Sequence, residues 1–186
     1  MATQSMAIDP AIAALIIGAG ALLFAAGALH KLRDLRRFDE IFMAYSLVPS
    51  SAPLRLSRLI PLLEGAVAGG LLFDTPRAAA AGVGIVLLLG YAAAIAINLR
   101  RGRRDLACGC GGPDDRRPIA AWMVWRNIAI ATLLGVVMLP WSARPLTATD
   151  GVTIGFGTVT FALVYLCLDR LLGRAGRVTA ELRLSS

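Results

Sequence analysis

Charged side chains are scarce in this chain. Of its 186 residues, 17% are Asp, Glu, Lys or Arg and 57% are hydrophobic, and the mean hydropathy is +0.69. Soluble globular domains carry about 25% charged residues, so the composition argues against a soluble domain and favours membrane-spanning segments. At this length the chain forms at most one compact unit.

Acidic residues are fewer than basic ones, 12 against 19, which gives a formal net charge of +7. A nucleic-acid-binding domain would gather such a charge on one soluble basic face. Here the arginines cluster at the ends of apolar runs, where membrane topology places them. We therefore exclude nucleic acid as a partner and expect a lipid bilayer instead.

Histidine and cysteine are also rare, with one histidine and three cysteines. Three cysteines do not make the disulfide framework of a small secreted domain. A zinc site at two of them would need ligands from a second subunit, because His30 is the single histidine and Cys167 is distant in sequence. No metal site is therefore predicted within one chain, and Cys167 is expected to act as a small hydrophobic residue.

Long apolar runs predict membrane-spanning helices. Two uncharged runs, Pro10–Leu29 and Ala78–Ile97, have 20 residues each, and a helix of about 20 residues crosses the roughly 30 Å hydrocarbon layer. Three further runs are expected to span the membrane: Pro53–Phe73, Ile119–Pro140 and Val152–Leu168. We do not expect the first run to be a cleaved signal peptide, because no Lys or Arg precedes it and it is long enough to stay in the bilayer.

Residues His30–Val48 show a different pattern. Apolar side chains recur every three or four positions, and charged side chains fill the opposite face, which predicts an amphipathic helix in the membrane interface. The predicted fold class is therefore all-α: an integral membrane bundle of four to five transmembrane helices plus one interfacial helix. A single transmembrane domain is expected over residues 8–172, with a polar tail over 173–186 and disorder at both termini.

Lysine and arginine are distributed unevenly between the connections. The segment between the first two spans carries six when the first turns of the second span are included, and the connection between the third and fourth spans carries six. The residues after the last span carry four, whereas the opposite side carries two. In a bacterial plasma membrane the positive-inside rule then predicts an external N-terminus. The same rule places the third connection and the C-terminus in the cytoplasm.

The third connection, Arg100–Pro118, holds two cysteines on either side of a glycine, Cys108 and Cys110. Neighbouring guanidinium groups favour the thiolate by lowering the pKa of a thiol. Three arginines are candidates for this role: Arg103, Arg104 and Arg116. A disulfide across one residue closes a strained ring, and strained disulfides are the more oxidising kind. This pattern favours thiol–disulfide chemistry over metal binding or two unreactive loop cysteines.

Polar residues also lie inside the predicted spans. Ionisable groups there are costly and usually have a partner, so the opposite charges of Glu64 and Arg126 predict an intramembrane pair. Such a pair fixes helix register, or it acts beside the cysteines or a bound quinone. Glu64 also precedes Gly65 and Gly69, whose spacing allows another helix to approach closely.

Four stretches of the sequence together form a pattern that is typical of one protein family: AAGALHKLRDLRRF, PLLEGAVAGGLL, NLRRGRRDLACGCGGPDDRRPI and AWMVWRN. Together, over Ile12–Leu139, they resemble the MauE family of methylamine-utilisation membrane proteins, which is related to the DoxX group. The resemblance implies a role in the maturation of methylamine dehydrogenase beside a thioredoxin-like partner. It also implies that Cys108 and Cys110 are the redox pair. The polar positions that match the family pattern, and are candidates for cofactor binding, are Glu64, Asn98, Arg126 and Asn127.

Two functions follow from these patterns. The first is a thiol–disulfide redox protein with quinone as a candidate cofactor. It is an oxidoreductase only if it catalyses repeated cycles of thiol–disulfide exchange. The alternative is a non-enzymatic assembly subunit. A homo-oligomer is compatible with this alternative. Disulfide delivery to an exported enzyme belongs on the oxidising outer side, whereas the arginine count places the cysteines inside, so the direction of electron flow stays open.

Overall fold

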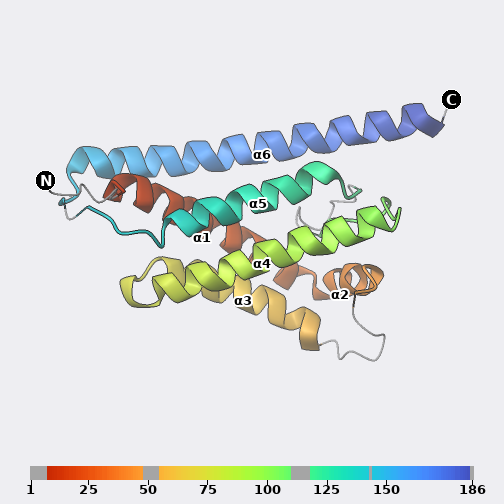
Figure 1. Ribbon diagram of the computed structural model, residues 1–186, viewed down its shortest axis with the longest axis horizontal. Helices are drawn as coiled ribbons and strands as arrows, with labels where there is room; N and C mark the ends of the chain where they lie inside the picture. Colours follow the sequence, from red (N-terminus) through yellow and green to blue (C-terminus); the bar gives the residue numbers. More distant parts are fainter. Residues whose placement is uncertain (1–7, 48–54, 110–117, 143, 185–186) are drawn as a thin grey trace, which may run out of the picture.

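The computed structural model describes residues 8–47, 55–109, 118–142 and 144–184, and within these ranges it is all-helical (Figure 1). Its helices in chain order are α1 (Pro10–Arg33), α2 (Leu35–Ala44), α3 (Arg55–Leu71), α4 (Asp74–Arg100), α5 (Ala121–Val136) and α6 (Ala148–Leu184). Three segments are long and apolar enough to cross a membrane: α1, α4 and residues Ala148–Leu172 of α6. The shorter α3 and α5 lie beside them in the bundle. The predicted helical membrane bundle is confirmed.

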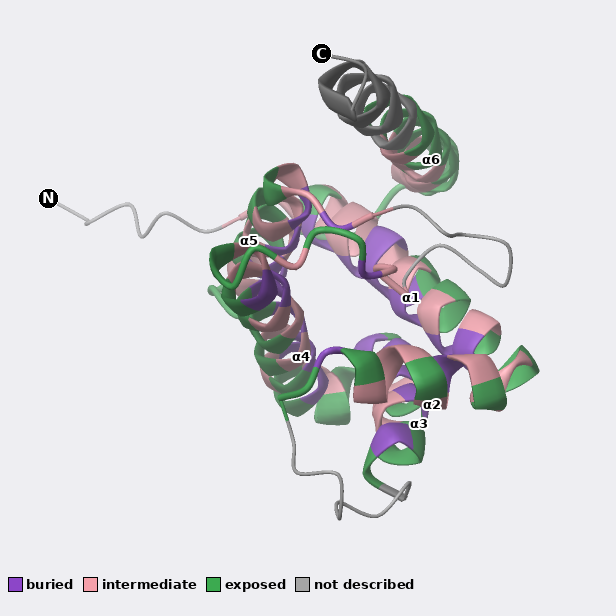
Figure 2. Cartoon of the chain, turned by 90° about the vertical axis from the view of Figure 1, so that its right-hand side faces the viewer, coloured by how far each residue is buried: buried purple, intermediate pink, exposed green. Residues whose placement is uncertain are grey.

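The helix α1 is the centre of the bundle. It packs against α3, α5 and α6, while α4 packs against α3 and α5. The main core lies where these helices meet and includes Phe24, Leu71 and Leu134, each at most 2% exposed. Buried residues lie on α1, α3, α4 and α5, and Figure 2 shows that the described part of α6 is mostly exposed. Among the described helices α6 packs closely against α1.

The boundary between α1 and α2 differs from the prediction. The amphipathic helix was expected to begin at His30, but α1 continues to Arg33 and α2 begins after Asp34. Asp34 has non-helical φ and ψ angles of −140° and 73°, and its carboxylate accepts a hydrogen bond from the backbone N–H of Arg37, as an N-cap residue does. As a result Lys31 lies on the buried side of α1 and not on the polar face of an interfacial helix.

The C-terminal tail also differs from the prediction of disorder. α6 continues without interruption from the last predicted span to Leu184. Arginine, leucine and alanine, residues with high intrinsic helix propensity, make up half of the tail. The polar composition that suggested disorder is therefore equally compatible with a helix.

The two ends of the bundle have different chemistry. At one end Arg144 forms ion pairs with Asp9 and Asp150 at 2.8 and 2.7 Å, and the chain near Ile8 pairs with Trp141. The Arg144 guanidinium holds the pKa of Asp9 below its usual value. At the opposite end lie α2, the C-terminal end of α4 and the base of the cysteine loop. The arginine-rich connections that follow α1 and α4 therefore lie at the same end of the bundle.

Glycines at helix contacts are not those of the predicted motif. A Cβ atom at Gly65 or Gly69 would have no neighbour within 4 Å among the described residues, so this chain makes no close helix contact there. Gly70 and Gly84 do make such contacts: a Cβ at Gly70 would lie 2.8 Å from Ala80, and one at Gly84 2.8 Å from Leu134. Gly70 and Gly84 are therefore positions at which a small residue allows α3, α4 and α5 to pack closely.

Candidate functional site: a buried ion pair between two cavities

A lysine and a glutamate from different helices form a buried ion pair. Nζ of Lys31, on α1, lies 2.8 Å from both carboxylate oxygens of Glu64, on α3, and the two residues are 5% and 3% exposed. The hydroxyl of Tyr91, on α4, donates a hydrogen bond of 2.7 Å to Oε1 of Glu64. Three helices thus each contribute one side chain, which satisfies the costly buried charges.

Local sequence makes room for this cluster. Gly27 precedes Lys31 by one helical turn, and a Cβ atom there would lie 3.2 Å from Oε1 of Glu64. The Lys31 ammonium also lies 5.5 Å from the ring centroid of Phe38 and 5.4 Å from that of Tyr91, which adds cation–π attraction. Phe38 belongs to α2, so the cluster ties the interfacial helix to the bundle.

The predicted pairing of Glu64 with Arg126 is wrong. Arg126, on α5, pairs with Asp169 of α6 at 2.5 Å and lies over the rings of Trp122 and Tyr165. Lys31 was not among the predicted site residues, because the first span was predicted to end at Leu29, which left the lysine in the interface. The spacing of four between Gly27 and Lys31, which places both on one helix face, was the signal available.

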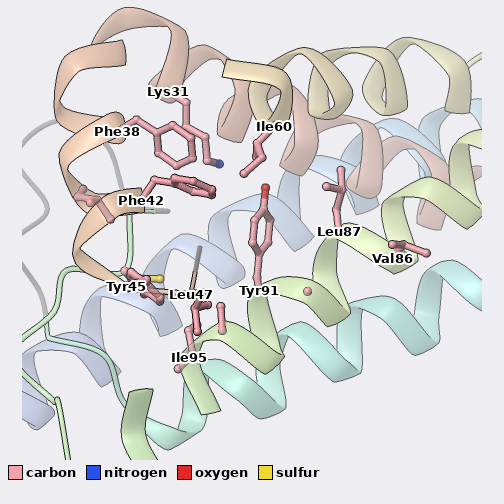
Figure 3. Close-up of a pocket in the computed structure, with 14 residues that line it drawn as sticks. Lys31, Phe38, Phe42, Tyr45, Leu47, Ile60, Val86, Leu87, Tyr91 and Ile95 are labelled. Atoms are coloured by element: carbon pink, nitrogen blue, oxygen red, sulfur yellow. The ribbon is translucent and has the colours of Figure 1, made fainter. Parts of the chain in front are cut away.

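An apolar cavity of about 280 Å³ lies on one side of the cluster, between α2 and α4. Figure 3 shows the Lys31 nitrogen and the Tyr91 hydroxyl pointing into it, with Phe38 and Phe42 along one wall. Cys108 also lines this cavity. The described cysteine of the predicted redox pair and the buried cation therefore share one apolar space.

A second, more polar cavity of about 230 Å³ lies on the other side of the cluster. Lys31 and Tyr91 line both cavities and so form the wall between them. Three predicted site residues, Glu64, Arg126 and Asn127, line the polar cavity. The Asn127 side chain is buried, at 3% exposed, and its amide nitrogen has no hydrogen-bond partner among the described residues.

Asn98 and Arg103 lie elsewhere and hold the end of α2. The Asn98 amide donates to the carbonyl oxygens of Tyr45 and Ala94 at 3.2 and 3.1 Å. The Arg103 guanidinium donates to Ala44 O at 2.7 Å and to Asn98 Oδ1 at 3.3 Å. These groups satisfy the last carbonyls of α2 and stabilise the negative end of its dipole. The hydrogen bonds of Asn98 and Arg103 therefore join the end of α4 and the start of the cysteine loop to the end of α2.

The base of the cysteine loop is fixed against α2 and α5. The Ile119 N–H donates to Leu106 O at 2.9 Å, and Ala107 pairs with Pro118. Gly109 has a φ angle of +72°, in the left-handed region, and a Cβ atom there would lie 3.2 Å from Ile41 of α2. Only glycine suits both constraints, so the residue between the two cysteines is set by packing as well as by backbone conformation.

The remaining predicted residues of the loop fall into two groups. Arg104 is exposed, and thiolate stabilisation by Arg103, Arg104 or Arg116 stays a prediction. Cys110 and Arg116 lie outside the described residues. Within the ranges that the structure describes, no three His, Cys, Asp or Glu side chains gather as metal ligands.

An all-helical bundle with spanning helices, a buried intramembrane ion pair and an apolar cavity beside a cysteine defines a polytopic membrane protein. Residues 8–140 match the family model of methylamine utilisation protein MauE, and the chain belongs to this family. It is 35% identical over 163 residues to the methylamine utilization protein MauE of Paracoccus denitrificans, with 87% of each chain covered.

Two further relatives carry the same description. The protein of Methylophilus methylotrophus is 31% identical over 172 residues, with 91% of this chain and 90% of the relative covered. That of Methylorubrum extorquens is 28% identical over 166 residues, with 87% and 88% covered. No solved structure matches the chain. The family match ends before α6, although α6 supplies the Asp169 partner of Arg126.

Proposed function

We propose that this protein is a membrane thiol–disulfide redox protein that serves methylamine utilisation, with Cys108 and Cys110 as its redox pair. The observation that carries the proposal is the position of Cys108, on a loop fixed at its base and beside a cavity that also contains a buried cation. Membership of the MauE family supports the metabolic assignment.

The chemistry is exchange with a thioredoxin-like partner. A thiolate of the pair attacks one sulfur of a partner disulfide, a mixed disulfide forms, and the partner's other sulfur leaves as a thiolate. The second cysteine then attacks the mixed disulfide, which releases the reduced partner and leaves a Cys108–Cys110 disulfide. The reverse sequence oxidises a partner dithiol with the same atoms and electrons in balance.

Trapping the mixed disulfide tests this proposal. In a Cys167→Ser background, we expect one of the single variants Cys108→Ser and Cys110→Ser to accumulate a partner protein in a covalent adduct that reductant releases. The reason is that the second thiol, which would resolve the adduct, is missing. Adducts are detected on non-reducing gels and the partner is identified by mass spectrometry.

The Cys108→Ser/Cys110→Ser double variant is the matched control. It should form no adduct and should fail to support methylamine-dependent growth of a host that requires the protein. Full growth of the double variant would contradict the redox proposal. It would favour the assembly-subunit alternative, for which the unoccupied Gly65 and Gly69 positions on α3 offer a contact face.

We also propose that the cysteine loop faces the cytoplasm of a bacterial cell, because the arginine-rich connections share one end of the bundle. A membrane-impermeant maleimide should then label Cys108 and Cys110 only after spheroplasts are opened, with Cys167 replaced by serine. Labelling of intact spheroplasts, before or after reduction, would reverse this topology and place the pair on the oxidising side.

A further inference from the structure

The apolar cavity between α2 and α4 has the properties of a binding site for a flat, lipid-soluble molecule. Its volume of about 280 Å³ is close to the lower limit of about 300 Å³ for ligand pockets. Phe38 and Phe42 supply aromatic surface inside it. Val86, which also lines it, is 70% exposed on a helix that is apolar enough to span the membrane. A molecule dissolved in the bilayer can therefore reach the cavity laterally.

One polar group inside the cavity is suited to a carbonyl oxygen. The Lys31 ammonium has three N–H donors, and its two described hydrogen bonds go to the two oxygens of Glu64. Its nitrogen points into the cavity (Figure 3), where the third proton can be donated. A ligand that combines an apolar ring with a carbonyl oxygen satisfies both the walls and this donor.

Cys108 adds a redox requirement to the same space. It lines the cavity, and Cys110 follows after one residue. We infer that the cavity binds a quinone that oxidises the Cys108–Cys110 pair, an assignment that rests on the redox function proposed above. An acceptor for two electrons that is apolar, ring-shaped and carbonyl-bearing is a quinone, and no other feature of the cavity needs a different ligand.

The reaction balances without a further reactant. The two thiols lose two electrons and two protons and form one S–S bond, and the quinone gains both electrons and both protons to become a hydroquinone. The Lys31 hydrogen bond stabilises the negative charge that develops on the quinone oxygen before it is protonated. The disulfide so formed then oxidises the dithiol of the protein partner.

Filling the cavity from its wall tests the assignment. Gly90 lines the cavity, and a Cβ atom there would meet nothing within 4 Å, so Gly90→Leu adds a side chain to the cavity without a clash at its Cβ. Gly82→Leu is the matched control, because Gly82 lies on the same helix, has equally open surroundings and lines neither of the two cavities.

The measurement uses the full chain, with Cys167→Ser, reduced and reconstituted in nanodiscs. Ubiquinone-1 or menadione is added, and the remaining thiols are counted with a polyethylene-glycol maleimide on gels. We expect the quinone-dependent loss of thiols to be slowed roughly tenfold or more in Gly90→Leu, a difference of about 1.4 kcal/mol or more, and to be unchanged in Gly82→Leu. Equal rates in Gly90→Leu and the parent, equal slowing in both variants, or no oxidation by either quinone would each overturn the inference.

Two controls separate this inference from the proposed function. Oxidation of the pair by diamide should be the same in Gly90→Leu as in the parent, because it does not use the cavity. One of the single variants Cys108→Ser and Cys110→Ser should also still trap its partner if the quinone assignment alone is wrong. If quinone binds to the Cys108→Ser/Cys110→Ser variant in calorimetry but no variant traps a partner, the exchange function fails while the binding site stands.

Discussion

Replacing Lys31 with methionine should destabilise the folded protein by about 3–5 kcal/mol, the cost of leaving one member of a buried ion pair without its partner. The methionine has a similar length and leaves little empty space. The Glu64 side chain, however, is 4% exposed and would then keep a hydrogen bond from Tyr91 but no counter-ion. Thermal unfolding in detergent, followed by circular dichroism, should show a midpoint lower by about 10 °C.

A second substitution identifies the partner. Adding Glu64→Gln to Lys31→Met removes the unpaired charge, while the glutamine carbonyl can still accept the hydrogen bond that Tyr91 donates to Oε1. We expect most of the lost stability to return, because a neutral replacement of a buried pair costs little. The same Glu64→Gln change should not rescue Arg126→Leu. Rescue of Arg126→Leu but not of Lys31→Met would restore the Glu64–Arg126 pair that the sequence had suggested.

The sequence predicted the helical membrane fold well because hydropathy is a local property. Each uncharged run of about 20 residues predicts a membrane-spanning helix from its own sequence alone. The boundary at Asp34 was less visible. It depends on a side-chain cap that competes with the continuous apolar periodicity from Leu32 onward. That single boundary decides whether Lys31 is an interfacial or a buried residue.

The candidate site was predicted only in part, because pairing in a bundle is a property of the tertiary arrangement. Charge complementarity correctly identified Glu64 and Arg126 as residues that need partners. Their partners are Lys31 and Asp169, and the sequence does not show which helices lie next to each other. Arginines of the cysteine loop illustrate the same limit. Arg101 and Arg103 donate to the carbonyls of Ser46 and Ala44, a capping role that depends on where α2 ends in space.

The cavity beside Cys108 was beyond any reading of local sequence. Its walls come from α1, α2, α3, α4 and the cysteine loop. None of these segments has a sequence pattern that predicts a ligand-binding site. Tyr91 was the one aromatic residue of its apolar run, which is the nearest thing to a signal. Its importance comes from the hydrogen bond to Glu64, a contact between residues 27 positions apart.

Removal of Asp169 should weaken the attachment of α6 to the bundle. The helix α6 packs against α1. Its contacts with α5 are at the polar cavity, where Asp169 pairs with Arg126 and the Arg126 guanidinium lies over the ring of Tyr165. Asp169→Leu removes the carboxylate and leaves the Arg126 guanidinium, 13% exposed, without this counter-ion. Because the pair is only partly buried, we expect a loss of up to about 3 kcal/mol, concentrated in the attachment of α6.

An engineered disulfide reports this attachment directly. A Cβ atom at Gly18 of α1 would lie 3.7 Å from Cβ of Thr158 on α6, within the range of about 3.5–4.5 Å that a disulfide requires. In a chain whose native cysteines are replaced by serine, Gly18→Cys/Thr158→Cys should cross-link readily, and Asp169→Leu should slow the cross-linking several-fold. Asp169→Glu, which keeps the carboxylate, is the control and should retain most of the rate. Unchanged cross-linking in Asp169→Leu would mean that packing against α1 alone holds α6 in place. The Arg126–Asp169 pair would then not be needed to keep α6 beside the polar cavity.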